Sequence, residues 1–223
     1  MRKVVVGTFL TVDGVMQAPG GPDEDREGGF EHGGWSVNYW DDVMGRLIVD
    51  LTLQAGALLL GRKTYEIFAA HWPRVGDEDP IAAKLNSVPK YVASRTLDEV
   101  TWNNSILIRG NVAEAVAALK EQSGAEIQVH GSGDLIQTLM EHDLVDEYRL
   151  WVFPVVLGKG KRLLAHGAVP AALKLVDTKV SSTDVAVHAY ERAGAIAYGS
   201  FAVDEQGETS ALWEKSHSPG LRR

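Results

Sequence analysis

Short apolar runs alternate with helical patterns along the first two thirds of the chain. Runs with the length and composition of buried strands occur at residues 4–10, 57–60, 89–94, 105–108 and 126–130. Between them, apolar side chains recur at three- and four-residue steps, which predicts helices over residues 41–55, from Thr64 onward, over 112–122 and over 135–143. This alternation is typical of an α/β domain with a parallel central sheet.

The pattern changes after Val145. Strand-like segments then follow one another without a helix between them, at residues 148–157, 173–181, 185–191 and 196–203. Strands in direct succession favour hairpins, so we expect antiparallel strands at the C-terminal edge of a mostly parallel sheet. Residues 204–223 are polar and without period, and we expect them to form a tail outside the domain.

A long glycine-rich loop separates the first strand from the first helix. Residues 17–38 include Pro19-Gly-Gly-Pro22 and the pairs Gly28-Gly29 and Gly33-Gly34. A segment of this length without regular structure is typical of disorder or of a lid over a functional site. We interpret it as a lid that becomes ordered when ligand binds, because glycine makes a fixed conformation costly in entropy.

Composition narrows the functional classes. The 223 residues carry a net charge of −8 without a cluster of Lys and Arg, which argues against nucleic-acid binding. No apolar stretch reaches the roughly 20 residues of a membrane span, and Thr8 and Thr11 interrupt the signal-like N-terminal segment. Cysteine is absent and the seven histidines lack metal-ligand spacing, so we predict no metal site. We expect a cytoplasmic protein with a small-molecule substrate.

Two glycine turns stand where a strand ends and a helix begins, Gly61-Arg-Lys-Thr64 and Gly131-Ser-Gly133. The N–H groups and partial positive charge of a helix N-terminus suit a phosphate, so this pair of turns indicates a dinucleotide. Each turn taken singly is also compatible with an ordinary loop. Neither matches G-x-G-x-x-G or G-x-x-x-x-G-K-[ST], which argues against a Rossmann domain and a P-loop nucleotidase.

Motifs in a characteristic order connect the sequence to a known superfamily. They are Thr11-Val-Asp-Gly14, Leu58-Leu-Leu-Gly-Arg-Lys-Thr-Tyr-Glu66, Tyr91-Val-Ala-Ser-Arg-Thr96, His130-Gly-Ser-Gly-Asp-Leu135 and Val145-Asp-Glu147. The chain resembles the dihydrofolate reductase superfamily, and within it stand-alone proteins similar to the C-terminal reductase domain of the bifunctional riboflavin deaminase-reductase. The resemblance implies one domain, residues 1–203, with a three-layer dihydrofolate reductase-like fold.

The resemblance also implies NADPH as the cofactor. Gly61, Arg62, Lys63 and Thr64 would hold the pyrophosphate, and Ser94, Arg95 and Thr96 would meet the 2′-phosphate that distinguishes NADPH from NADH. Gly131, Ser132, Gly133, Asp134 and Leu135 would pass close to the nicotinamide side of the pyrophosphate. The sequence departs here from dihydrofolate reductase, which has two adjacent glycines at this turn.

The proton donor is the larger departure. Dihydrofolate reductase has a carboxylate on its first helix at the position that corresponds to Gly45. This chain therefore lacks the proton donor that dihydrofolate reductase uses on a folate substrate. Asp41 and Asp42 lie one turn earlier, and they would either approach the site or stabilise the helix dipole. Asp13 resembles the riboflavin-reductase pattern and would position substrate or lid, or would only bond its own turn. These three are the catalytic candidates.

Aromatic residues near the start of the first helix are the candidate substrate contacts. Trp35, Tyr39 and Trp40 would stack on a pyrimidine, pterin or nicotinamide ring, or would pack in the core. Gly14, in the Asp-Gly turn after the first strand, completes the predicted substrate set.

Together these features predict an NADPH-dependent reductase that transfers a hydride to a C=N or C=O group. The substrate would be a small heterocycle or a ribityl- or ribosyl-aminopyrimidine, as for the similar 5-amino-6-(5-phosphoribosylamino)uracil reductase. The alternatives are pterin reduction of the dihydrofolate reductase type, flavin-based reduction, and a non-catalytic nucleotide-binding protein. We also predict a homodimer, because the C-terminal hairpins present strand edges that must be covered and relatives of this branch commonly pair there.

Overall fold

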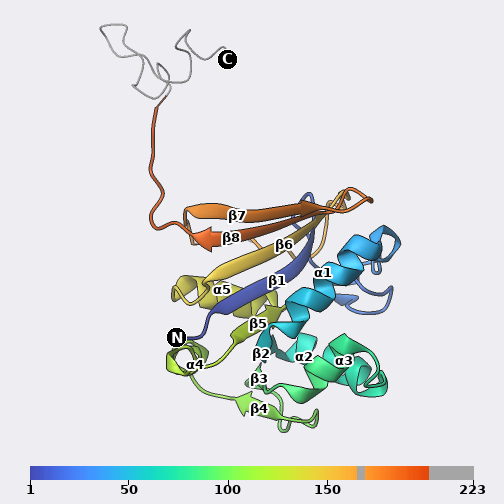
Figure 1. Ribbon diagram of the computed structural model, residues 1–223, viewed down its shortest axis with the longest axis vertical. Helices are drawn as coiled ribbons and strands as arrows, with labels where there is room; N and C mark the ends of the chain where they lie inside the picture. Colours follow the sequence, from blue (N-terminus) through green and yellow to red (C-terminus); the bar gives the residue numbers. More distant parts are fainter. Residues whose placement is uncertain (165–168, 201–223) are drawn as a thin grey trace, which may run out of the picture.

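One mixed sheet organises the chain, of which the computed structural model describes residues 1–164 and 169–200. Its strands lie in the order β4-β3-β2-β5-β1-β6-β8-β7 (Figure 1). Their bounds are β1 Val4–Thr11, β2 Ala55–Gly61, β3 Lys90–Ala93, β4 Ser105–Ile108, β5 Glu126–His130, β6 Glu147–Phe153, β7 Leu173–Val180 and β8 Ala186–Arg192. The helices are α1 Asp42–Leu53, α2 Arg62–His71, α3 Pro80–Ser87, α4 Val112–Glu121 and α5 Gly133–Glu141.

Helices cover both faces of the sheet (Figure 1). Leu58 and Leu60 of β2 pack toward α2 and α3, whereas Ala57 and Leu59 pack toward α4 and α5. This division follows from the two-residue period of a strand, which sends successive side chains to opposite faces. The result is the predicted three-layer α/β fold.

The C-terminal strands form the predicted antiparallel edge, and the first of them also joins the parallel part of the sheet. β6 pairs in parallel with β1, because the chain reaches it from β5 through the crossover helix α5. Among the strands of the described residues, β8 pairs antiparallel with both β6 and β7. The strand predicted over residues 196–203 is wrong for residues 196–200, which have no strand; residues 201–203 and the predicted tail 204–223 lie outside the described residues.

Helix starts depart from the prediction at two places. α3 was missed, although Asp79 accepts hydrogen bonds from the N–H groups of Ile81 and Ala82 and Pro80 occupies the first helical position. α2 begins at Arg62 instead of Thr64, with Gly61 as its N-cap. The Thr64 hydroxyl is engaged elsewhere, as described below, so the prediction of Thr64 as the helix start is wrong.

The loop of residues 17–38 follows a path that its own contacts hold. The indole N–H of Trp35 donates to the carbonyl of Gln17 at 2.8 Å, and the Gln17 amide donates to the carbonyls of Asp25 and Glu27. Phe30 is buried against Val15 and Ala18. These contacts offset part of the conformational entropy that the glycine-rich loop loses when it adopts one conformation. That the loop becomes ordered when ligand binds stays a prediction.

No helix in the described part of the chain combines the length and apolar character needed to cross a bilayer.

Candidate functional site

A cavity of about 1040 Å³ lies where the carboxyl ends of β1, β2, β3 and β5 meet. This edge is the usual ligand position in open parallel sheets. Every residue predicted for cofactor binding lines the cavity, namely Gly61, Arg62, Lys63, Thr64, Ser94, Arg95, Thr96, Gly131, Ser132, Gly133, Asp134 and Leu135. The fold therefore brings the three predicted segments together. Their role in binding a cofactor stays a prediction.

The two glycine turns are joined by hydrogen bonds between Thr64 and Ser132. The Gly61 N–H donates to Ser132 Oγ at 2.9 Å, and the Ser132 N–H donates to Thr64 Oγ1 at 3.1 Å. Gly131 has φ +51°, and a Cβ there would lie 3.0 Å from Thr64 Oγ1, so the close approach favours glycine. The N-termini of α2 and α5 are thereby held side by side at one end of the cavity.

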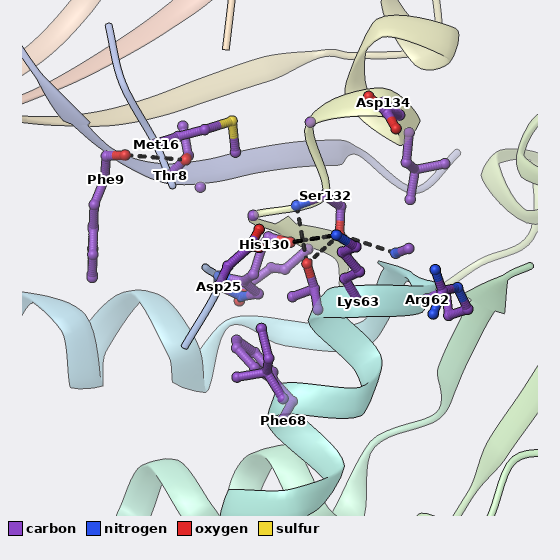
Figure 2. Close-up of a pocket in the computed structure, with 18 of the residues that line it drawn as sticks. Thr8, Phe9, Met16, Asp25, Arg62, Lys63, Phe68, His130, Ser132 and Asp134 are labelled. Atoms are coloured by element: carbon purple, nitrogen blue, oxygen red, sulfur yellow. Dashed lines mark hydrogen bonds and ion pairs between the residues drawn. The ribbon is translucent and has the colours of Figure 1, made fainter. Parts of the chain in front are cut away.

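Loop carboxylates face the cations at these helix ends. The Lys63 ammonium forms ion pairs with Glu27 and, at 3.9 Å, with Asp25, while Lys161 lies 2.5 Å from both carboxylates. Hydrogen bonds from Lys161 and Lys63 lower the pKa of Glu27 to about 2. Burial, the largest single cause, acts to raise the pKa of Asp25, but the contacts with Lys161, the Glu27 N–H and Lys63 together outweigh it and the net shift is downward. Asp25 and Glu27 thus attach the loop to the cations of the cavity lining as ionised carboxylates; Figure 2 labels Asp25 and Lys63.

Sequence reasoning missed Asp25 and Glu27. They stand among other acidic residues in an irregular loop, and nothing in the local sequence places them against Lys63, which is 36 residues from Glu27. Lys161 contacts the same carboxylates from the segment after β6.

The turn after β3 presents a free guanidinium to the cavity. Ser94 Oγ accepts hydrogen bonds from the N–H groups of Thr96 and Leu97, at 3.1 and 3.0 Å, which fixes the turn. Arg95 is exposed and forms no ion pair with any residue that the structure describes. Its charge is therefore available to an anion at this end of the cavity.

The predicted catalytic carboxylates lie outside the cavity lining. Asp13 accepts hydrogen bonds from the Thr11 hydroxyl at 2.6 Å and from the N–H groups of Leu157 and Gly158, and these contacts, with Thr11 foremost, lower its pKa to about 2. Asp41 caps α1 through the Met44 N–H and also binds Ser182, whose hydroxyl is the main cause of its lowered pKa. Asp42 is exposed in the first turn of α1. Asp41 caps its helix as the structural alternative predicted, whereas Asp13 bonds beyond its own turn to the segment after β6; the catalytic roles of both stay predictions.

The predicted substrate residues separate into two groups. Trp40 lines the cavity and stacks on Trp151 with ring centroids 6.0 Å apart. Trp35 and Tyr39 instead pack edge-on against Phe153 in the core, and Gly14 occupies the turn beside β1 away from the lining. Only Trp40 of this set can contact a molecule in the cavity as it stands.

The floor of the cavity carries a polar network that sequence reasoning also missed. Glu126, Gln128 and His130 alternate along β5 and share one face, and Arg149 of β6 forms a bidentate ion pair with Glu126 at 2.7 and 2.9 Å. Ser132 Oγ donates to the His130 carbonyl at 2.9 Å, and Figure 2 draws both residues in the cavity lining together with Phe68 of α2. The spacing of Glu126, Gln128 and His130 at every second residue of a strand was the sequence feature that could have predicted that these polar side chains share one face of the sheet.

Comparisons with known proteins agree with this geometry. Residues 2–187 match the family described as RibD C-terminal domain. The uncharacterized protein YyaP of Bacillus subtilis (strain 168) is 33% identical over 189 residues, which cover 82% of this chain and 92% of that protein.

Two solved structures share the fold. A Shewanella sp. PV-4 protein described as a riboflavin biosynthesis protein superposes with a TM-score of 0.64 at 21% identity, covering 85% of this chain and 98% of that one. Dihydrofolate reductase from Enterococcus faecalis complexed with NADP(H) gives a TM-score of 0.55 at 14% identity, covering 86% and 96%. With a family match that spans most of its length, the chain belongs to the RibD C-terminal domain family.

Proposed function

We propose that this protein is an NADPH-dependent reductase of a small heterocyclic or aminopyrimidine-like substrate. The observation that carries the proposal is the convergence of two helix N-termini at Gly61 and Gly131 on one cavity, with cationic side chains beside them. Helix N-termini and cations together suit a bridging pyrophosphate. Family membership supports the same reaction class.

The residues present fit the cofactor. Lys63 and the first-turn N–H groups of α2 would hold the pyrophosphate, and Gly131 keeps the space between the turns free of a side chain. Arg95, exposed and without an ion-pair partner among the described residues, would bind the 2′-phosphate. A phosphate at Lys63 would compete with the contacts from Glu27 and Asp25, so cofactor binding and loop position should be coupled.

The bound dihydronicotinamide would supply a hydride to an electron-poor C=N or C=O carbon of the substrate. The chain's own contribution is an apolar enclosure, in which Phe9, Trp40, Phe68 and Trp151 line the cavity and exclude water from the reacting atoms. Asp25 lies in the lining, but its lowered pKa keeps it ionised and unsuited to donate a proton at neutral pH. We therefore assign the proton to water admitted at the loop.

The same observations give less support to the alternative functions. Pterin reduction of the dihydrofolate reductase type uses an acid on α1, whereas the α1 residues in the lining are Ile48, Leu51 and Thr52. A non-catalytic nucleotide-binding protein would share the cofactor contacts. It would differ by never oxidising NADPH when candidate heterocycles are added.

Calorimetry with NADPH and NADH on three variants tests the cofactor assignment. Arg95→Ala should weaken NADPH binding roughly ten- to a hundredfold and leave NADH unchanged, because a charge-assisted hydrogen bond contributes about 1.5–3 kcal/mol and only NADPH carries the 2′-phosphate. Arg62→Ala should weaken both cofactors, and Arg46→Ala, on the exposed part of α1, should affect neither. Equal losses for NADPH and NADH in Arg95→Ala, or no binding below millimolar concentration by the parent protein, would overturn the assignment.

A further inference from the structure

His130 ends β5 and forms part of the cavity floor. Its ring lies against Phe68, with centroids 6.0 Å apart, and beside the backbone of Gly7 on β1. A Cβ built on Gly7 would lie 3.7 Å from both Nδ1 and Cε1 of the imidazole, so this edge of the ring passes close to the backbone of β1. Figure 2 draws His130 among the residues that line the cavity.

Neighbouring hydrogen bonds determine which ring nitrogen carries the proton. The Gln128 amide donates to the Leu51 carbonyl at 2.7 Å and to Glu126 Oε1 at 2.6 Å, and both partners can only accept. Gln128 Oε1 is therefore the atom that faces His130 Nε2, at 3.1 Å. Since an amide oxygen only accepts, Nε2 must carry the hydrogen. The orientation of Gln128 depends in turn on Glu126, which Arg149 holds in a bidentate pair.

The ring is neutral at physiological pH, which leaves Nδ1 with a lone pair. Burial lowers the pKa of His130 to about 4, with an upward contribution from Glu126 and a downward one from Arg149. No side chain or N–H group of the described residues donates to Nδ1. His130 lines the cavity and its Nδ1 has no partner among the described residues, so a molecule in the cavity gains affinity by supplying the donor.

We propose that His130 Nδ1 is a hydrogen-bond acceptor that selects substrates presenting an N–H or NH₂ group to the cavity floor. A carbonyl or ether oxygen at the same place would oppose its lone pair to that of Nδ1, and a methyl group would leave Nδ1 unsatisfied. The selected class is an amino-substituted or ring N–H heterocycle, flat enough to lie between Phe68 and the wall formed by Phe9 and Trp40. This inference rests on the proposed function in placing the substrate at the floor.

A matched pair of heterocycles and a matched pair of variants test the role of Nδ1. 6-Aminouracil and 6-methyluracil differ by an NH₂ donor and a methyl group of similar size. The parent protein should bind 6-aminouracil about tenfold more tightly, the effect of one additional hydrogen bond to Nδ1. His130→Asn places an amide oxygen near the position of Nδ1 and should keep part of the preference. His130→Gln places its amide near the position of Nε2, retains the Gln128 contact and should lose the preference.

Nitrogen-detected NMR of the imidazole gives a second readout that needs neither cofactor nor turnover. The expected spectrum is that of the neutral tautomer protonated at Nε2, with the Nδ1 signal moving on addition of 6-aminouracil and staying in place with 6-methyluracil. Equal affinities in the parent protein, a preference that persists in His130→Gln, or a ring protonated at Nδ1 would overturn the proposal. Failure of NADPH binding would instead refute the proposed function, because these measurements contain no NADPH.

Discussion

Removing the cation beneath the cavity floor should destabilise the protein more than removing its carboxylate partner. Arg149 lies between two carboxylates, with Nη1 and Nη2 at 2.7 and 2.9 Å from Glu126 and Nε at 2.7 Å from Glu147. All three side chains are only 11–12% exposed. Arg149→Met therefore leaves Glu126 poorly solvated and without a cation, and leaves Glu147 with Lys3 alone at 3.4 Å, whereas Glu126→Gln leaves Arg149 still paired with Glu147.

The two variants differ in expected magnitude for this reason. Breaking a buried ion pair by removing one partner costs about 3–5 kcal/mol, and Arg149→Met should fall in that range because Glu126 loses its cation and Glu147 keeps only Lys3, at 3.4 Å. Glu126→Gln keeps an amide oxygen as acceptor and loses mainly the charge on one hydrogen-bonded pair, about 2 kcal/mol. The double variant should be more stable than Arg149→Met alone, since it removes the carboxylate that Arg149→Met leaves without a cation.

Urea unfolding of the parent protein, the two single variants and the double variant measures these differences. The midpoint should shift while the denaturant slope stays constant, which would show that the native fold is retained. Glu126→Gln as costly as Arg149→Met, or a double variant whose loss equals the sum of the single losses, would refute the reasoning. Either result would mean that Glu147 and solvent, not Glu126, set the energetics of Arg149.

Two further predictions concern a buried lysine and the outer strand. The Lys90 ammonium is buried, donates to the carbonyls of Asn86 and Asn103 at 2.7 and 2.9 Å, and has a pKa lowered to about 8 by burial. Because this pKa lies below the ordinary 10.5, the unfolded chain binds more protons than the folded protein between about pH 8 and pH 10.5. The contribution of Lys90 to the free energy of unfolding should therefore rise with pH in that window. Lys90→Met should flatten this rise in the free energy of unfolding. We also propose a homodimer through β7, because the residues of this outer strand are all exposed, including Leu175 and Val180. Light scattering at micromolar concentration should report a dimer, and Val180→Lys should convert it to a monomer. A monomeric parent protein would contradict this proposal.

Most of the layered architecture could be predicted from local pattern. The apolar runs at β1, β2 and β5 and the glycine turns that follow β2 and β5 were identified at their observed positions, because strand burial and helix starts depend on residues near in sequence. The direction of β6 could not be predicted in this way. A strand pattern is the same for parallel and antiparallel pairing, and only the crossover through α5 decides between them.

The candidate site likewise has a part that the sequence predicted and a part that depends on the tertiary structure. The sequence by itself determined that two glycine turns and the Ser94-Arg95-Thr96 turn follow strands whose ends share an edge, and these segments line one cavity. Only the tertiary structure decided that Asp41 binds Ser182, that Glu27 meets Lys63, and that Gln128 orients His130. The role of a titratable side chain depends on the charges and hydrogen-bond partners within a few ångströms, and most of these partners are dozens of residues distant in the chain.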